Sequence, residues 1–248
     1  MSTKILLSAT VIWLLTACFS IKSQRSEPDF LKNCEQLVIV NSSGEGSTTA
    51  KMGYFSKTKN GWQQMADGIP VMLGRSGLAW GRGLHEPQPG LQKREGDGKS
   101  PSGIFRFGTA FGRVPASEIS WKLPYVQVTG SLECVDDSKS KFYNQIVDNQ
   151  KVEKDWNSSE QMWEVGSQYD WGVFVEHNDP AQPQGGSCIF LHVWGGPGMV
   201  TSGCTAMAER HLLELLKWLD PSKRPLLIQL TESSFPDFQK KYNLPELP

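Results

Sequence analysis

The sequence has 248 residues and a formal net charge of −1. This length suffices for one substantial domain with its own core, and not for two. The near-neutral charge argues against nucleic acid as a partner, because a nucleic-acid-binding domain presents a strongly basic face. Nine tryptophans and 24 glycines indicate a β-rich domain with many tight turns.

The N-terminus has the features of an export signal. An apolar run over residues 5–17 follows Lys4. At about 13 residues it is too short to span a bilayer and suits the apolar part of a signal peptide. The run ends in Leu-Thr-Ala-Cys, which resembles a bacterial lipobox, so we expect Cys18 to be lipidated and to become the mature N-terminus. An ordinary cleaved signal peptide is the alternative.

These features predict the organisation of the chain. Residues 1–17 form the signal peptide, and residues 18–34 form the lipidated N-terminus and a flexible tether of polar, mixed-charge composition. One folded domain is expected over residues 35–232 and a C-terminal tail over residues 233–248. Residue 19 is Phe rather than Asp, so the chain lacks a feature resembling an inner-membrane retention signal. We therefore expect an exported protein, lipid-anchored at the periplasmic face of the outer membrane.

Strand patterns dominate the first part of the predicted domain. The dipeptide at residues 60–61 is Asn-Gly between two alternating segments, which predicts a β-hairpin. A charged turn at residues 93–98 leads into a predicted strand at residues 104–107. Residues 125–129 alternate and predict another strand, whereas residues 138–150 are polar and predict a loop with room for a short helix.

The second part of the domain contains the one clear helix pattern. Apolar segments at residues 171–176 and 187–194 predict two strands that pair antiparallel through a loop at residues 178–186. The helix is predicted over residues 205–219, because its leucines recur at helical spacing and a proline follows. A last strand is predicted over residues 226–230.

A histidine at the end of a predicted strand and a cysteine at the start of this helix suggest nucleophilic catalysis. At a helix N-terminus, the dipole and free N–H groups would favour the Cys204 thiolate. His192 would take the thiol proton and return one to the leaving amine. Gly203 and the neighbouring amides would let a substrate approach and would hold the oxyanion. The alternative is a buried cysteine and an unrelated core histidine.

Three segments of the sequence resemble the L,D-transpeptidase (YkuD-domain) family. Residues 187–194 (SCIFLHVW) and 201–207 (TSGCTAM) resemble its signature, in which a histidine precedes a Ser/Thr-x-Gly-Cys element. Residues 93–105 (KREGDGKSPSGIF) resemble a segment from the N-terminal part of the same domain. The resemblance implies a mainly β, YkuD-like sandwich with one principal helix behind the catalytic cysteine.

The resemblance also implies the chemistry and the partners. Cys204 would attack a carbonyl of a peptidoglycan stem peptide, D-alanine would leave, and an amine of a second stem would resolve the thioester. Ser202, Thr205 and Trp194 would contact the substrate. The membrane would be reached only through the lipid anchor. No cofactor is implied.

Two positions depart from the family pattern and leave the reaction open. Ser202 and Ala206 stand where well-known members have a second histidine and an arginine. The sequence therefore resembles a divergent subgroup. One alternative is an L,D-carboxypeptidase, or a hydrolase of stem or protein–wall bonds, that uses the same Cys/His pair. A second alternative is a non-catalytic wall-binding lipoprotein.

Three cysteines remain once Cys18 and Cys204 are assigned to lipid and catalysis. In an exported domain they favour one disulfide. We expect it between Cys134 and Cys188, since Cys34 lies at the end of the tether. Cys188 is predicted to lie out of reach of Cys204, because it is four residues, or roughly 13 Å, from His192 along a strand.

The other polar residues receive weaker roles. His177 is expected at the surface or in a hairpin, and His211 is expected to be solvated on the helix. Arg94 and Lys99 would either bind a substrate carboxylate or belong to a solvent-exposed charged turn without a binding role. No His, Cys or carboxylate residues show metal-ligand spacing, so we expect no metal site.

Overall fold

The computed structural model describes residues 28–247. The predicted signal peptide at residues 1–17, the lipidation site Cys18 and most of the tether lie outside the described residues. Within residues 28–247, the helices are all too short or too polar to cross a bilayer.

The domain consists of one large sheet, one small sheet and two α-helices. The ten-stranded sheet has the order β10-β11-β12-β3-β2-β1-β13-β5-β4, with β6 added to β5. Because β5 also pairs with β10, the large sheet closes on itself. The mainly β prediction is therefore confirmed. The strands are β1 (Gln36–Ser42), β2 (Thr49–Thr58), β3 (Gly61–Met72), β4 (Leu78–Trp80), β5 (Ser100–Gly112), β6 (Tyr125–Gln127), β7 (Leu132–Val135), β8 (Ile146–Asp148), β9 (Ser159–Gln161), β10 (Trp171–Val175), β11 (Phe190–Val193), β12 (Thr205–Met207) and β13 (Leu226–Thr231), and the helices are α1 (Glu209–Trp218), α2 (Phe235–Tyr242) and the 3₁₀ turns η1 (Ala116–Glu118), η2 (Gly166–Tyr169) and η3 (Pro221–Lys223).

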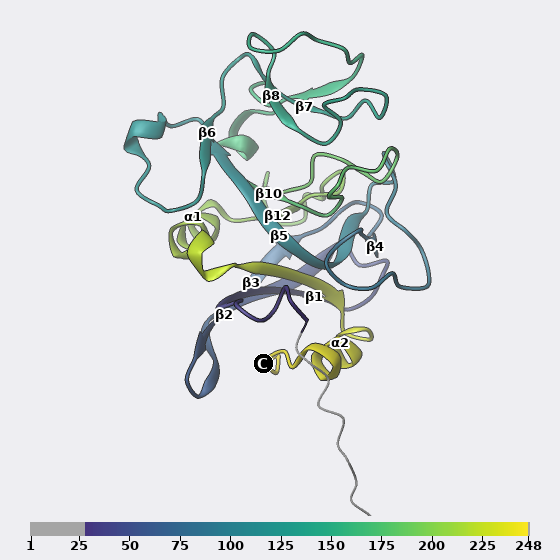
Figure 1. Ribbon diagram of the computed structural model, residues 1–248, viewed down its shortest axis with the longest axis vertical. Helices are drawn as coiled ribbons and strands as arrows, with labels where there is room; N and C mark the ends of the chain where they lie inside the picture. Colours follow the sequence, from purple (N-terminus) through teal and green to yellow (C-terminus); the bar gives the residue numbers. More distant parts are fainter. Residues whose placement is uncertain (1–27, 248) are drawn as a thin grey trace, which may run out of the picture.

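Strand β1 is buried on both faces, which explains its continuous apolar run. Val38 and Val40 lie in the core cluster that contains the leucines of α1. Leu37 and Ile39, on the opposite face of the strand, lie in the cluster that contains α2. The two helices therefore cover opposite faces of the closed sheet, as Figure 1 shows.

Two sequence-based pairings are confirmed. The Asn-Gly dipeptide joins β2 and β3, whose ends pair as Thr58 with Gly61, and Gly61 has a φ of 106° that favours glycine. Strands β10 and β11 pair antiparallel, with Gly172 opposite His192. This second pair carries the histidine of the proposed site.

The predicted start of the helix is wrong. α1 begins at Glu209, whereas residues 205–207 form strand β12, which pairs with β11 on one side and β3 on the other. All three residues of β12 are buried. Strands β11 and β3 satisfy the backbone hydrogen-bonding groups of residues 205–207. This pairing therefore overrides the helical pattern, which extends from Leu212 back toward residue 205.

The predicted C-terminal tail is part of the fold. α2 buries Phe235, Phe238 and Tyr242 against the lower face of the large sheet. Leu31 and Cys34, from the predicted tether at the N-terminal side of the sequence, join the same cluster and are 2% and 0% exposed. The ordered domain therefore extends beyond residues 35–232 in both directions.

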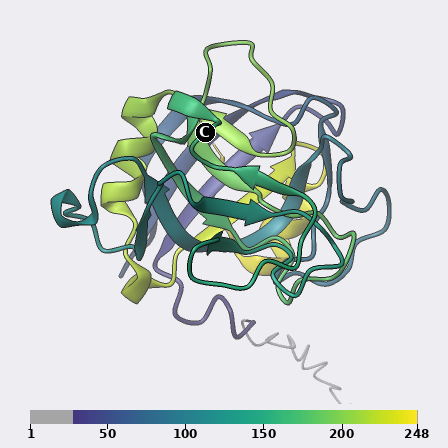
Figure 2. The same cartoon turned by 90° about the horizontal axis from the view of Figure 1, so that it is seen from above.

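The small sheet was not predicted. It has the order β8-β7-β9 and lies at the top in Figure 1, on the side of the domain opposite α2. Figure 2 shows it from above, over the closed sheet. The predicted loop at residues 138–150 contributes β8 and turns rather than a helix. The small sheet packs beside the end of β11 and so covers the region of Cys204.

Candidate active site

Cys204 ends a tight turn that connects the loop after β11 to β12. Thr201 holds this turn, because its Oγ1 accepts from the Gly203 N–H at 3.1 Å and donates to the Cys204 carbonyl at 2.6 Å. Gly203 has a φ of 151°, and a Cβ there would lie 3.0 Å from the Lys99 carbonyl oxygen. Only glycine therefore fits immediately before the cysteine.

The Cys204 thiol is buried and neutral in its surroundings. Its Sγ accepts from the Phe190 N–H at 3.3 Å and lies 3.5 Å from the Cys188 carbonyl, to which the thiol can donate. Burial raises the pKa of Cys204, and the nearby charge of Glu160 raises it further. The Phe190 N–H and Lys93 oppose these effects. Cys204 thus needs a base to become a nucleophile.

This environment differs from the predicted one. Because α1 begins at Glu209, five residues after Cys204, the thiol is not at a helix N-terminus. The dipole that was expected to favour the thiolate is therefore absent from the site.

His192 lies on β11 and is 5% exposed. Its Nδ1 donates to the Val193 carbonyl at 2.7 Å, so the neutral ring carries its lone pair on Nε2. Burial lowers the pKa of His192 to about 4, and the carbonyls of Val193 and Gln168 oppose that shift. The Tyr169 ring packs edge-on against the imidazole, with centroids 5.4 Å apart. At neutral pH His192 is therefore uncharged and held in place.

The structure places His192 and Cys204 on one face of two neighbouring strands. β11 and β12 pair in parallel, with His192 opposite Ala206, two residues beyond Cys204. Two residues correspond to roughly 6.6 Å along a strand and return to the same face. Among residues 28–247, no hydrogen bond joins the His192 ring to the Cys204 thiol. The two groups are neighbours in the resting site, not a bonded pair.

A cavity of about 400 Å³ opens at Cys204. Ser202 lines it, and the Ser202 hydroxyl accepts from the Arg75 guanidinium at 3.1 Å. Thr205 and Trp194 do not line the cavity. The Thr205 hydroxyl is buried and donates to Gln229 at 2.8 Å. The cavity is lined by Arg75, Lys93, Glu95, Gly96, Asp136, Glu160, Ser187, Cys188, Ile189, Ser202, Gly203 and Cys204.

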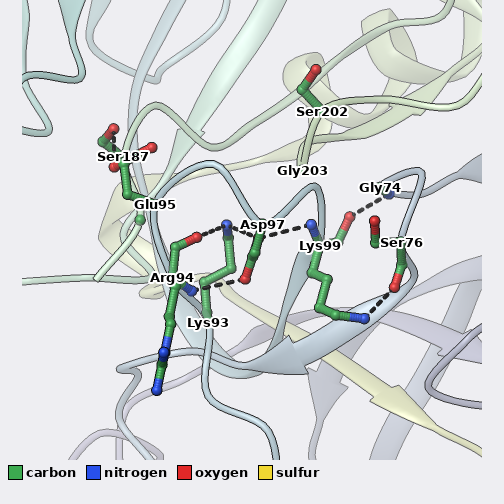
Figure 3. Close-up of polar contacts among 12 residues, drawn as sticks. Gly74, Ser76, Lys93, Arg94, Glu95, Asp97, Lys99, Ser187, Ser202 and Gly203 are labelled. Atoms are coloured by element: carbon green, nitrogen blue, oxygen red, sulfur yellow. Dashed lines mark hydrogen bonds and ion pairs between the residues drawn. The ribbon is translucent and has the colours of Figure 1, made fainter. Parts of the chain in front are cut away.

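One wall of the cavity comes from Lys93, Glu95 and Gly96. They belong to the charged segment at residues 93–99, whose polar contacts are drawn in Figure 3. The Lys93 ammonium is buried and bonds the Asp97 carboxylate at 2.6 Å. Asp97 also accepts from the N–H groups of Arg94 and Lys99, which closes the turn. The Lys99 ammonium donates to the Ser76 carbonyl. Arg94 and Lys99 were candidates for a substrate carboxylate, but Lys93 is the basic residue of this segment that lines the cavity.

The small sheet contributes two acidic residues to the cavity that were not predicted from the sequence. Glu160 of β9 and Asp136, which follows β7, both line the cavity. Burial raises the pKa of Glu160 to about 7, Asp136 adds to the rise, and a hydrogen bond from Tyr169 opposes it. Glu160 is 44 residues from Cys204 in a short polar strand, so no local pattern marks it.

Cys134 and Cys188 form a disulfide in the structure, with their Cα atoms 5.9 Å apart. The bond ties β7 of the small sheet to the segment that precedes β11. The predicted distance between Cys188 and Cys204 was wrong, since the Cys188 carbonyl contacts the Cys204 thiol. Cys188 has a φ of 54°, so the extended strand begins only at Phe190. Cys204 is a free thiol, and Cys34 takes no part in this disulfide.

Removing this disulfide is expected to destabilise the domain. The bond closes a loop between residues 54 apart, and in the chain-entropy description such a loop contributes about 4 kcal/mol. The Cys134→Ala/Cys188→Ala double variant should therefore lose roughly that free energy of unfolding, measured by urea denaturation. Cys34→Ala, which removes no disulfide, serves as the control. An unchanged midpoint and slope in the double variant would contradict the expectation.

Two other histidines, His177 and His211, take no part in the proposed site. His177 was expected at the surface but is fully buried, and burial lowers its pKa to about 3. His211 lies on α1, partly exposed, with its Nδ1 3.6 Å from Glu214. Within residues 28–247, no three His, Cys, Asp or Glu residues are grouped so that they could hold a metal ion.

Comparison with known proteins identifies the domain. Residues 37–228 match the YkuD family, described as the L,D-transpeptidase catalytic domain. No curated protein matches the sequence. A similar solved structure is that of the helical cell shape determining protein Pgp2 from Campylobacter jejuni, at 12% sequence identity and a TM-score of 0.39, covering 80% of this chain and 49% of that one. The chain thus spans about half the length of that protein.

Proposed function

Because the chain belongs to the family of L,D-transpeptidase catalytic domains, which modify peptidoglycan, we propose that it transfers acyl groups between stem peptides through Cys204. The observation that carries this proposal is the position of Cys204. Its thiol is outside the disulfide and lines a cavity, and a neutral buried histidine lies on the adjacent strand.

The proposed first step begins with proton transfer from Cys204 to His192. The thiol turns from the Cys188 carbonyl toward Nε2 of His192 as substrate enters, since apo sites often tighten only in the substrate complex. Sγ then attacks the carbonyl on the L-centre of the diamino acid, and the peptide bond to D-alanine breaks. The leaving amine takes the proton from His192, and a thioester remains on Cys204.

The second step releases the acyl group. An amine of a second stem attacks the thioester, the new amide bond forms, and the sulfur leaves as a thiolate. The attacking amine loses its proton to His192, which returns it to Cys204. If water replaces the amine, the same residues give a carboxypeptidase or a hydrolase. Ser202 and Ala206 depart from the family pattern, so hydrolysis is an alternative that the experiment must distinguish from transpeptidation.

Product analysis distinguishes these reactions. Purified protein incubated with monomeric muropeptides should yield cross-linked dimers with release of D-alanine. Shortened monomers without dimers would instead assign a carboxypeptidase. A lack of any product, together with no covalent adduct on exposure to a carbapenem, would contradict an enzymatic role and favour a wall-binding protein.

We also propose that the protein is exported and held to the membrane by lipid on Cys18. The support is the apolar run at residues 5–17 and the lipobox-like sequence that ends it. The mature N-terminus should be residue 18, and Cys18→Ser should move the protein from the detergent-extracted to the soluble fraction. A mature N-terminus at another residue would refute lipidation.

A further inference from the structure

Glu160 is fixed relative to the nucleophile by a short chain of bonds. In the small sheet, Glu160 of β9 pairs directly with Cys134 of β7. Cys134 is joined by the disulfide to Cys188, and the Cys188 carbonyl lies 3.5 Å from the Cys204 Sγ. The carboxyl group of Glu160 thus lines the cavity of Cys204 from a second sheet that is covalently tied to the first.

Within residues 28–247, one side-chain donor holds the Glu160 carboxyl group. The Tyr169 hydroxyl donates to it. Tyr169 is 2% exposed and its ring packs against Phe111, Phe190 and His192, so it is held in place. A carboxylate accepts about four hydrogen bonds, and the cavity therefore leaves acceptor positions of Glu160 free.

The charge of Glu160 is not matched by a cation of the described residues. No ion pair involves Glu160 in residues 28–247, and Asp136 adds a second negative charge nearby. The two cations of the cavity have other partners: Lys93 bonds Asp97, and Arg75 donates to Ser202. Burial of an unpaired carboxylate is costly, and a cation delivered by a ligand removes that cost.

A second carboxylate that lines the cavity, that of Glu95, has two donors of its own. Glu95 accepts from the hydroxyl groups of Tyr143 and Ser187. Asp136 accepts from Ser158 at the edge of the small sheet. Among the three acids, Glu160 is the one whose charge raises the pKa of the Cys204 thiol, and its donor Tyr169 packs against His192.

We propose that Glu160 determines substrate specificity by binding a primary ammonium group of the substrate beside the carbonyl that Cys204 attacks. The inference rests on the proposed function, in which the substrate is a stem peptide with a diamino acid. Tyr169 orients the carboxylate, and the disulfide sets its distance from Cys204. Glu160 is a binding residue and forms no covalent bond.

Binding to the full chain carrying Cys204→Ala tests this role without turnover. The ligands are a stem tetrapeptide with a free side-chain amine on its diamino acid and the same peptide acetylated on that amine, and affinity is measured by calorimetry. The free-amine peptide should bind about tenfold or more tightly than the acetylated one, because the acetyl group removes the charge and leaves Glu160 unpaired. Adding Glu160→Gln should abolish the preference by weakening only the free-amine peptide.

Two further variants separate recognition from folding. Glu160→Asp keeps the charge and should retain part of the preference. Glu164→Gln changes an exposed glutamate three residues beyond β9 and should retain all of it. Equal affinity for the two peptides before Glu160 is changed, or a preference that survives Glu160→Gln, would overturn the role of Glu160 while leaving stem binding intact. If neither peptide binds, the proposed stem substrate itself is wrong, and the inference falls with it.

Discussion

Cys204→Ala is expected to reduce stem-peptide processing by roughly 10⁴-fold or more, since loss of the nucleophile removes the covalent route. The fold should survive, because the thiol makes only two polar contacts, to the Phe190 N–H and the Cys188 carbonyl. Release of D-alanine from a tetrapeptide stem measures the effect, and thermal unfolding checks the fold.

Cys34→Ala is the matched control for this prediction. Cys34 is also a buried cysteine outside the Cys134–Cys188 disulfide, but it lies in the cluster that contains α2 and does not line the cavity of Cys204. Its replacement should leave turnover unchanged. Near-normal D-alanine release by a folded Cys204→Ala protein would remove Cys204 from the mechanism.

His192→Ala should slow acylation by about 10²–10⁴-fold, the usual contribution of general acid–base assistance. The effect should be large here because burial raises the pKa of Cys204, so the thiol must lose its proton to a base during attack. The acylation rate is measured by single-turnover mass spectrometry. His211→Ala, on the partly exposed face of α1, is the control and should acylate at the unsubstituted rate.

The pH profile gives this prediction a second readout. His192 has a pKa of about 4, so it is neutral and able to accept a proton above that pH and protonated below it. Because the cavity carboxyl group of Glu160 has a pKa of about 7, the profile is measured in Glu160→Gln, where kcat/KM should fall as pH drops through about 4 and stay level above it until other groups titrate. Adding His192→Ala to that variant should remove this acid limb. An acid limb that persists unchanged in the variant would assign the base to another residue.

Local patterns predicted those parts of the fold that local chemistry decides. Asn60-Gly61 supplies the backbone conformation a tight hairpin needs, and the structure has that hairpin. The Cys204 and His192 motifs lie close together in the sequence, and their strands are neighbours in the sheet. These features required no information from distant segments.

The features that sequence reasoning missed depend on distant partners. Residues 205–207 became a strand because β3 and β11 flank them, although their pattern continues the helix of the following leucines. Strands β8 and β9 have three residues each, too few for a recognisable period. Glu160 gains its significance only from Tyr169, the disulfide and the cavity of Cys204, which the small sheet brings together.

The most direct test of the central proposal is the mass of the intact protein after brief incubation with a tetrapeptide stem and acid quenching. The account predicts one adduct equal to the acyl group of the stem without D-alanine, which peptide mapping places on Cys204 and hydroxylamine removes as expected for a thioester. The Cys204→Ala protein should show none. Stem processing by the unsubstituted protein without such an adduct, or with the adduct on another residue, would contradict catalysis through Cys204.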